Sequence, residues 1–427
     1  NNVDQTGTRT LTLDVADGSA AYDLVMSGEF RDYDNLTGTD VIKTGAGVLR
    51  LDGSLNYTGD TIVNGGVLVL TKSGSLDPAG HPGQFGASGN TVTVNNGATL
   101  RLTGWWTMGD GGQHTLIADG GTIDFATSAN YQNTITLIGG AITGNSWRNG
   151  HHAGDATITV EQSDVSSTIS GTLTFVKNRS GGLGKTTFDV ADGAAEHDLV
   201  VSARIVDLSG HEGRSLAKDG PGAMSLSGAN TFAGGVNVNA GTLLVNNTTG
   251  SGTGTGAVNV SSGATLGGTG TIGGATTIAG GATLATGASV GTLTFDSDLT
   301  LQDGATWDWE FVTNTAGEYD QAVGSTLVLP AEGSGAITLN ILGLDGYSLE
   351  AGDSFTLFTG DVYLGSTLLD AGTDITSMFN ISDDIGWWGD WEVTAGSLIL
   401  TAVPEPGAGL ILLSVLAYGL LARRRKD

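Results

Sequence analysis

Several residue types are missing or scarce in this chain, and each shortage excludes a class of protein. The 427 residues contain no cysteine, which excludes disulfides, thiolate metal sites and a cysteine nucleophile. Lysine and arginine together number 17 against 44 aspartate and glutamate residues, and the formal net charge is −27. Because nucleic-acid backbones attract basic proteins, no nucleic acid is expected as a partner. No window has the period of a soluble amphipathic helix, which argues against helical solenoids.

Glycine, in contrast, is abundant. The chain has 71 glycines, about 17 % of its residues against a usual share of about 7 %, but only 6 prolines. The glycines do not follow the three-residue period of collagen. Together with many Thr, Val, Leu and Ala residues, they predict short strands joined by tight turns. The excess of acidic residues suits an exported protein that must stay soluble.

The chain contains an internal duplication. The segment LDVADGSAAYDLVMS at 13–27 returns as FDVADGAAEHDLVVS at 188–202, an offset of 175 residues. At the same offset and without a gap, residues 42–70 fall on 217–245. Lys43 then meets Lys218, and Tyr57 meets Phe232. The two stretches are therefore copies of one module.

A finer period runs inside each module. A phrase of small residues, Thr or Val and one large apolar residue recurs, and clean neighbours lie 18 to 23 residues apart. Repeats of this length indicate a solenoid. Segments such as VTVNNGATLRL alternate apolar and polar residues on both sides of a Gly-containing turn, which predicts two short strands for each repeat. The predicted fold is all-β, a right-handed parallel β-helix, with an all-β sandwich as the alternative.

Changes in composition and strand pattern divide the chain into four predicted parts. Residues 1–175 form the first β-helix module and residues 176–295 the second. From 296 to 401 the strands become longer and richer in aromatic residues, which predicts a β-rich cap or a closing jelly-roll-like segment. Residues 402–427 are a separate tail. No signal-peptide pattern is visible near Asn1, so such a peptide was removed or lies outside this sequence.

The two copies also resemble a known repeat. Residues 45–70, GAGVLRLDGSLNYTGDTIVNGGVLVL, and residues 220–245, GPGAMSLSGANTFAGGVNVNAGTLLV, are similar to the autotransporter-associated β-strand repeat. The second copy follows the pattern nearly throughout, whereas the asparagine of the first copy is shifted by one place. In that family the repeats form β-helical passenger segments. The resemblance thus implies a surface or extracellular stalk and no fixed activity.

The tail reads AVPEPGAGLILLSVLAYGLLARRRKD. Residues 407–422 are almost entirely apolar and predict a transmembrane helix of about 24 Å, slightly short of a bilayer core. A buried core helix is the alternative, but it fits poorly with the basic cluster that follows. By the positive-inside rule this cluster stays cytoplasmic, and residues 1–403 lie on the opposite side. The residues predicted to anchor and stop the helix are Leu410, Leu412, Leu416, Leu420, Arg423, Arg424 and Arg425.

This order of Pro-Glu-Pro, one hydrophobic helix and an arginine cluster resembles the PEP-CTERM sorting signal. The resemblance implies a bacterial exported protein that an exosortase-type protease recognises and cleaves near Pro404, Glu405 and Pro406. The protein would be anchored transiently in the inner membrane and then reach the cell surface or the extracellular space.

Candidate motifs for chemistry fail on inspection, and no catalytic residue, metal ligand or cofactor is predicted. SGGLGKTT at 180–187 lacks the first glycine of a phosphate loop, and DYDNLTG at 32–38 lacks the ligands of a calcium loop. The repeated DVADG is interpreted as a turn around Asp17 and Asp192. The pair His151 and His152 has no third ligand in view except Asp155, so an exposed loop is favoured over a metal site. A β-helix can carry a polysaccharide-degrading site, but no carboxylate pair is marked for it.

Two patterns suggest binding. The tryptophans in GWWTMGDGG and GWWGDWEV lie between glycines and present flat rings that stack on sugars, although packing in the core or cap is the alternative. These possible glycan contacts are Trp105, Trp106, Trp387, Trp388 and Trp391. Thr-x-Thr pairs at 91–93, 172–174 and 292–294 suggest a flat array for ice binding, although Thr is also an ordinary outward strand residue.

The sequence therefore predicts a non-enzymatic, exported bacterial surface or extracellular-matrix protein of structural or adhesion type. Its expected partners are an exosortase-type protease, cell-envelope or exopolysaccharide glycans, and the membrane through the tail. The alternative is a glycan-binding or polysaccharide-degrading β-helix protein, with ice binding ranked below it.

Overall fold

The computed structural model describes most of the chain before the tail. The described residues are 9–32, 38–71, 90–104, 114–126, 130–131, 134–145, 147–149, 155–178, 181–287, 289–333, 335–343, 349–383 and 390–403. Within these ranges the regular elements are β-strands, apart from one turn of 3₁₀ helix at Thr376–Met378. The predicted all-β class is confirmed. None of the described helical residues forms a helix with the length and apolarity needed to cross a membrane, and the helix predicted at 407–422 lies outside the described residues.

The described chain divides into two compact units. The first covers the described residues up to Asn259 with Gly263–Thr265 and Gly270–Gly274. The second covers Val260–Ser262, Leu266–Thr269 and the described residues from Ala275. The boundary between the units falls within β27 (Val258–Val260) and β28 (Thr265–Gly268), whereas β29 (Thr271–Ile272) belongs to the first unit. The boundaries predicted at residues 175, 295 and 401 stay predictions.

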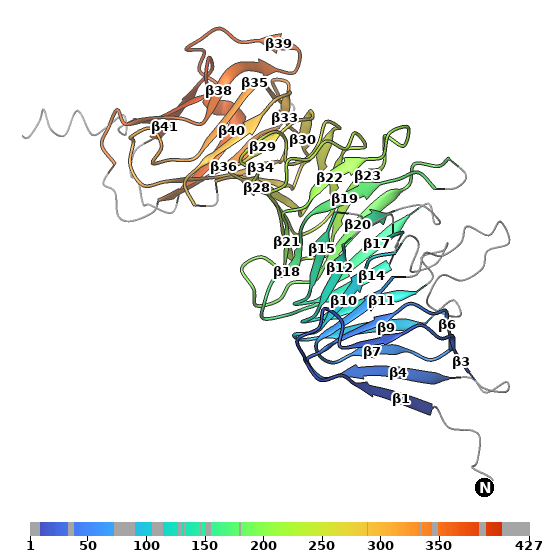
Figure 1. Ribbon diagram of the computed structural model, residues 1–427. Coiled ribbons are helices and arrows are strands. Elements are labelled where there is room, and N and C mark those ends of the chain that lie inside the picture. The colour runs from blue at the N-terminus through green and yellow to red at the C-terminus, as the bar shows by residue number, and fades with distance from the viewer. Residues whose placement is uncertain are drawn as a thin grey trace, which may run out of the picture. The chain divides into compact units, whose positions relative to one another are not determined.

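In the first unit, short strands stack in chain order into parallel sheets (Figure 1). The first sheet contains β1 (Arg9–Asp14), β4 (Thr39–Thr44), β7 (Thr61–Val63), β9 (Thr91–Asn95), β11 (Thr115–Asp119), β14 (Thr134–Ile138), β17 (Ala156–Val160), β20 (Lys185–Val190), β23 (Ser215–Asp219) and β25 (Val236–Val238). The second contains β2 (Leu24–Met26), β5 (Val48–Leu51), β8 (Val67–Leu70), β10 (Thr99–Leu102), β12 (Thr122–Phe125), β15 (Ala141–Gly144), β18 (Ser167–Ile169), β21 (Leu199–Val201), β24 (Ala223–Leu226) and β26 (Thr242–Val245).

A further set of strands forms a third side of the coils. These are β3 (Phe30–Arg31) paired with β6 (Leu55–Asn56), and β13 (Asn130–Tyr131), β16 (Trp147–Asn149), β19 (Thr172–Phe175) and β22 (Arg204–Asp207). Each strand pairs in parallel with the equivalent strand one coil further along the chain, as in a parallel β-helix. This parallel pairing is consistent with the predicted β-helix.

The core of the first unit is a ladder of the apolar residues that end the repeated phrase. Leu49 lies beside Leu68, Leu68 beside Leu100, and Leu100 beside Ile123. All four side chains are buried, because successive parallel strands lie about 4.8 Å apart and stack equivalent residues directly. The turn before each of these strands needs glycine. Gly66 and its copy Gly241 have φ values of 58° and 64°, in the left-handed region that disfavours side chains.

The second unit begins with parallel strands and ends with antiparallel ones. Its strands are β30 (Thr276–Ile278), β31 (Thr283–Thr286), β32 (Thr292–Phe295), β33 (Leu299–Leu301), β34 (Thr306–Phe311), β35 (Gln321–Leu329), β36 (Ile337–Gly343), β37 (Ser354–Thr356), β38 (Phe358–Leu364), β39 (Thr367–Leu368), β40 (Phe379–Asp383), β41 (Asp390–Thr394) and β42 (Ile399–Val403). Pairs such as β34 with β36 and β36 with β40 are parallel. Among the described strands of this unit, β38 pairs antiparallel with β39, and β42 pairs antiparallel with β37 and β41, while isolated antiparallel bridges link Phe311 with Tyr319 and Asp374 with Thr394. The jelly-roll-like closing segment stays a prediction.

Aromatic residues fill the core of the second unit. Trp307, Trp309 and Phe311 alternate along β34 with their side chains fully buried. The ring of Phe355 packs edge-on against Trp309 at 5.0 Å between centroids. The aromatic residues that become frequent in the sequence after residue 296 thus include the core of this unit.

Candidate functional site: a polar framework repeated in two copies

The two sequence copies build the same buried cation site. In the first, Lys43 Nζ donates to the carbonyls of Thr44, Gly45 and Gly65 at 3.1, 2.8 and 2.8 Å. In the second, Lys218 Nζ donates to Asp219, Gly220 and Ala240 at 3.0, 2.9 and 3.1 Å, the same positions 175 residues later. Both lysine side chains are buried. Each ammonium group ties the turn of its own coil to the turn of the next.

Burial lowers the pKa of both lysines. For Lys218 the pKa falls from 10.5 to about 8 because the ammonium group is desolvated, although Asp219, Asp189 and Asp198 oppose the shift. For Lys43 burial also lowers the pKa, and Asp14 and Asp23 oppose it. Carbonyl oxygens accept the hydrogen bonds of each ammonium group and so compensate for its loss of water, and the acidic residues lie around it. This arrangement supports the structure of the coils.

A repeated aspartate forms the second part of the framework. Asp23 accepts the backbone N–H of Gly18 at 2.9 Å and that of Val48, one coil further, at 2.7 Å. Its copy Asp198 accepts the N–H of Gly193 at 2.7 Å and that of Ala223 at 2.8 Å. Each carboxylate thus ties a DVADG turn to the following coil.

A second aspartate repeats this role on the third side of the coils. Asp32 accepts the N–H of Thr58 at 2.9 Å, and its copy Asp207 accepts the N–H of Ala233 at 2.8 Å. In contrast, Asp17 and Asp192, which the sequence singled out in the DVADG turns, are exposed. Their interpretation as turn residues agrees with this position. The aspartates that hold the turns were not predicted from the sequence, although the duplication preserves them.

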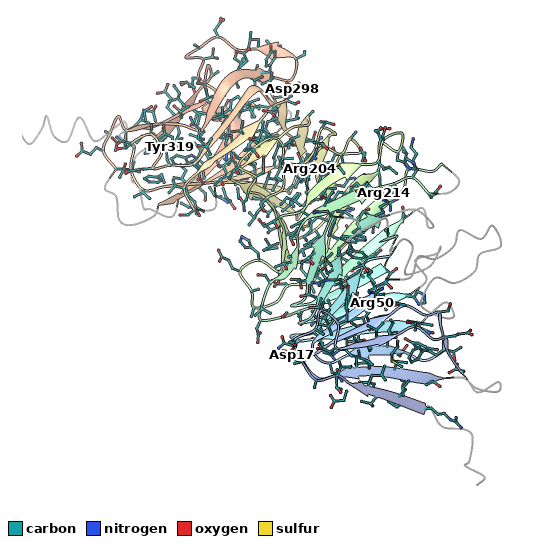
Figure 2. The ribbon with its side chains drawn as sticks, in the orientation of Figure 1. Asp17, Arg50, Arg204, Arg214, Asp298 and Tyr319 are labelled. Atoms are coloured by element: carbon teal, nitrogen blue, oxygen red, sulfur yellow. The ribbon has the colours of Figure 1, made fainter. Side chains whose placement is uncertain are left out.

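The second copy has an additional buried cation. Arg214, labelled in Figure 2, donates from Nε to Thr186 Oγ1 at 2.8 Å and from Nη1 to the carbonyl of Leu183 at 3.2 Å. Thr186 in turn donates to Asn149 Oδ1 at 2.7 Å. Burial lowers the pKa of Arg214 to about 10, with Asp155 opposing the shift. The equivalent position in the first copy is Thr39, so this link belongs to the second copy.

In the second unit, one buried carboxylate likewise binds two backbone N–H groups. Asp320 is buried and accepts the backbone N–H of Gly291 at 2.9 Å and that of Glu310 at 3.0 Å. Burial raises its pKa to about 8, the two N–H groups oppose this shift, and the charge of Glu310 adds to it. A perturbed carboxyl group is a common sign of catalysis, but here its oxygens bind the backbone.

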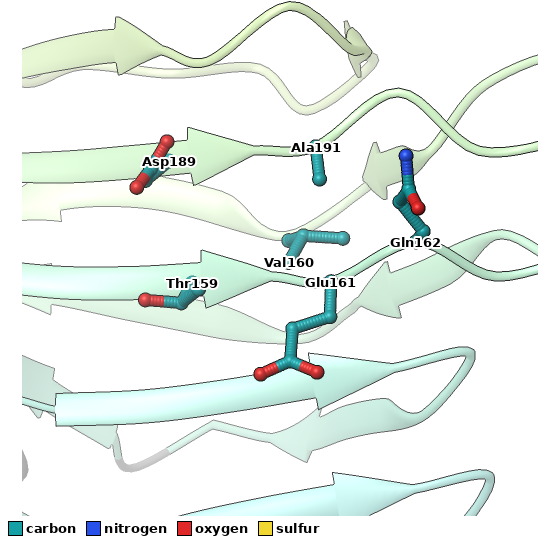
Figure 3. A pocket seen from close by; sticks show the side chains of 6 residues that line it. All are labelled: Thr159, Val160, Glu161, Gln162, Asp189 and Ala191. Atoms are coloured by element: carbon teal, nitrogen blue, oxygen red, sulfur yellow. The ribbon is translucent and has the colours of Figure 1, made fainter.

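One open groove lies on the outer face of the first unit. Figure 3 shows it between β17 and β20, with Glu161 and Asp189 on neighbouring stretches of chain. Its volume is about 470 Å³, and its lining is Thr159, Val160, Glu161, Gln162, Asp189 and Ala191. Nowhere in the described ranges do three or more His, Asp or Glu residues gather in a way that could hold a metal ion.

The structure groups threonines differently from the sequence prediction. The predicted pairs at 91–93 and 172–174 lie in different sheets of the first unit, on β9 and β19, and the pair at 292–294 belongs to the second unit. Instead, Thr91 lies beside Thr115 on one column of the first sheet, and Thr134 beside Thr157. Two residues further on, the next column contains Thr93, Ile117, Thr136 and Thr159. Four neighbouring strands thus present seven threonines on one outward face.

Most of the other predicted site residues lie outside the described residues. These are Trp105, Trp106, His151, His152, Trp387, Trp388, Pro404, Glu405, Pro406 and the whole hydrophobic tail with its arginines. Trp391 lies on β41, where its backbone faces Ala402 of β42.

Comparison with known families identifies the two copies. Residues 41–70 and 216–245 each match the family model described as passenger-associated-transport-repeat. These are the segments that the sequence analysis compared with autotransporter-associated β-strand repeats, and this part of the resemblance is confirmed. No curated protein matches the chain. Both matches contain the buried lysine, and they indicate a surface or secreted protein of the passenger type.

Proposed function

We propose that this protein is an exported bacterial surface or extracellular-matrix scaffold that carries no catalysis. The observation that supports it best is the use of the charged groups that recur in the two copies of the module. Lys43, Lys218, Asp23 and Asp198 all bind backbone groups of adjacent turns. Groups used in this way hold coils together and are withdrawn from chemistry.

The proposal includes sorting through the C-terminal tail. Pro404, Glu405 and Pro406 would be recognised by an exosortase-type protease, while the apolar helix and Arg423–Arg425 hold the chain in the inner membrane until cleavage. Mass spectrometry of the C-terminal peptide in membrane and extracellular fractions tests this part. A terminus near Pro404–Pro406 outside the cell supports it. An intact Asp427 found solely in membranes overturns it.

We further propose cell-envelope or exopolysaccharide glycans as partners, through the glycine-flanked tryptophans. The test is retention of the protein on immobilised polysaccharide. Paired Trp105→Ala and Trp106→Ala substitutions, and separately Trp387→Ala and Trp388→Ala, are expected to lower retention because stacking on sugar faces is lost. No retention of the wild type removes glycan binding. Release of reducing sugar from the same polysaccharides would contradict the assignment of a scaffold without catalysis.

A second candidate function, binding to ice, is favoured by the threonine columns on β9, β11, β14 and β17. Parallel strands repeat at about 4.8 Å and alternate residues at about 6.6 Å, so the hydroxyl and methyl groups form a regular two-dimensional array. Inhibition of ice recrystallisation tests it, with Thr134→Lys and Thr157→Lys in the array and Thr174→Lys on β19 as the matched control. Inhibition lost with the first two alone supports this function, and none by the wild type removes it.

A further inference from the structure

Exposed apolar side chains gather where β2 begins in the first unit. Tyr22, Leu24 and Val25 are 39, 37 and 46 % accessible, whereas Leu199, the copy of Leu24, is fully buried. Tyr22 comes just before β2, and Val25 lies on the strand itself. An accessible ring beside apolar side chains marks a surface that can hold a partner.

The ring of Tyr22 lies against a fixed cation. The guanidinium carbon of Arg50, a residue labelled in Figure 2, is 4.9 Å from the centroid of this ring. Arg50 Nε also donates to Asp52 Oδ1 at 2.7 Å, and the hydroxyl of Thr71 donates to the same carboxylate oxygen. The guanidinium group is therefore held between a carboxylate and one face of the ring.

This arrangement continues along the outer face of the second sheet. Val25 stands in register beside Arg50, and Arg50 beside Val69. Arg101 follows on the other side of Val69, and its Nε donates to Asp124 Oδ2 at 2.9 Å. The residues that alternate with the two arginines on β5 and β10 are buried, so both arginines point outward. We call Val25, Arg50, Val69 and Arg101 the arginine column, which extends over about 14 Å, three strand spacings.

The second copy of the module closes its coils without this cluster. At the positions of Tyr22, Arg50 and Asp52 it has His197, Ser225 and Ser227. Ser225 is buried and accepts a hydrogen bond from Asn246 Nδ2 at 3.1 Å. The aspartate and lysine that bind the turns are nevertheless common to both copies. The ring, the guanidinium group and its carboxylate are thus additional to the framework that holds the coils together.

We propose that the arginine column, together with the ring of Tyr22, binds an uncharged polysaccharide chain that lies across β2, β5, β8 and β10. This inference rests on the proposed partnership with glycans, and it names a class of glycan and a site apart from the tryptophans. An accessible phenol ring stacks on the apolar face of a sugar. Guanidinium and carboxylate groups held in pairs present donors and acceptors to neighbouring sugar hydroxyl groups.

The charges of this surface favour an uncharged chain over an acidic one. Each arginine is paired with a carboxylate, Arg50 with Asp52 and Arg101 with Asp124, so these four groups carry no net charge. The whole chain has a net charge of −27 and repels an acidic polymer. The two arginine side chains are still 33 % and 47 % accessible, so their remaining N–H groups can meet hydroxyl groups.

Retention of the full chain on immobilised dextran, mannan and alginate is the first test. We expect retention on dextran or mannan, which are uncharged, and none on alginate, which is acidic. Tyr22→Leu keeps an apolar side chain but removes the ring, and it is expected to weaken binding at least about tenfold. Tyr22→Phe keeps the ring and should stay within about twofold of the wild type. His197→Leu is the matched control in the second copy and should leave binding unchanged.

The outcomes separate this inference from the proposed function. If Tyr22→Leu binds like the wild type while the paired Trp105→Ala and Trp106→Ala substitutions remove binding, the glycan partnership stands and the arginine column is overturned. Retention on alginate alone overturns the choice of an uncharged chain. If none of the three polysaccharides retains the wild type, the column and the glycan partnership both fall.

Hydroxyl-radical footprinting, read by mass spectrometry, is a second test that needs no substitution. Bound dextran or mannan is expected to lower the oxidation of Tyr22 at least about threefold, because a stacked sugar covers the ring. Tyr363, half-buried on β38 in the second unit, is the internal control and should be oxidised equally with and without the polysaccharide. Unchanged oxidation of Tyr22 in the polysaccharide-bound protein overturns the proposal.

Discussion

The repeat at 41–70 and the repeat at 216–245 bind the same backbone groups with the same charged residues, but they differ around these residues. Tyr57 of the first copy bonds its hydroxyl to Thr61 at 2.5 Å, whereas the second copy has Phe232 and Val236 at these places. Leu55 of the first copy is fully buried, and its counterpart Asn230 is buried but hydrogen-bonded.

This comparison separates the residues that the two copies share from those in which they differ. Lys43 and Lys218 satisfy carbonyls of glycine-containing turns that both copies need in order to close a coil. The residues that differ fill space or bind neighbours outside the repeat. Asn230, for example, accepts the N–H of Ile205 at 2.7 Å and donates to the carbonyl of Gly252 at 2.6 Å. Backbone closure is thus common to the copies, and side-chain packing depends on the adjacent coils.

The largest expected difference between the copies lies at Leu24 and Leu199. Leu199→Ala should lower the free energy of unfolding by about 3 kcal/mol, because it leaves a cavity in a closed core. Leu24→Ala should lower it by less than about 1 kcal/mol, because that side chain is already partly in water. Urea unfolding followed by circular dichroism measures both. Equal losses would mean that the two coils are equally covered.

The lysines come next. Lys218→Met should destabilise the protein by about 2 kcal/mol at pH 10, since the surrounding carbonyls lose the N–H groups of the buried amine. Because the folded pKa is about 8 and the ordinary value 10.5, the unfolded chain binds more protons between these pH values. The contribution of Lys218 to stability therefore rises with pH across this window, and the gap between wild type and variant should widen from pH 8 to pH 10. A gap that narrows contradicts the lowering of the pKa of Lys218 by burial.

Asp320 in the second unit should show the opposite slope. Its pKa is raised from 3.8 to about 8, so the folded chain binds more protons and the contribution of this group to stability falls as pH rises through that range. Asp320→Asn keeps one acceptor but places an NH2 group against the other N–H, so it should destabilise the protein at pH 4 by about 1 to 2 kcal/mol. At pH 9 the loss should be smaller, because the variant has no charge to bury. Thermal unfolding at both pH values measures this. Destabilisation of similar size at both would show that the charge is irrelevant.

A reciprocal exchange tests the residues that differ. Asn230→Leu leaves the N–H of Ile205 and the carbonyl of Gly252 without this partner and should cost about 2 kcal/mol. Leu55→Asn should cost a similar amount, because it brings an amide into an apolar site. Chemical denaturation of both variants gives the comparison. If either substitution leaves the free energy of unfolding unchanged, positions 55 and 230 accept both side chains and the comparison fails there.

The smallest effect is expected at the tyrosine. Tyr57→Phe removes one buried hydrogen bond and should cost about 1 kcal/mol. Phe232→Tyr should cost at least as much, because Val236 offers no partner for the new hydroxyl. Denaturant midpoints measured side by side decide the order. A stabilising Phe232→Tyr would reveal a partner other than residue 236.

The sequence predicted the apolar ladder well, because Leu49, Leu68 and Leu100 end a phrase that repeats at the length of one coil. It did not predict that Lys43 points inward while Ile42 faces outward, since alternation alone favours the reverse. The carbonyls that accept from Lys43 meet only once successive coils are stacked. The same holds for Asp23, whose second partner is 25 residues away, and for threonine columns built from four separate strands.

Labelling of intact bacterial cells with a membrane-impermeant amine reagent tests the account most directly, because it reports location and framework together. Lys185 is exposed, whereas Lys43 and Lys218 are buried and bound to carbonyls. We expect Lys185 to be labelled on intact cells, and Lys43 and Lys218 to be labelled after unfolding alone. Labelling of Lys185 solely after lysis would contradict surface exposure. Labelling of all three lysines at one rate would contradict the buried framework.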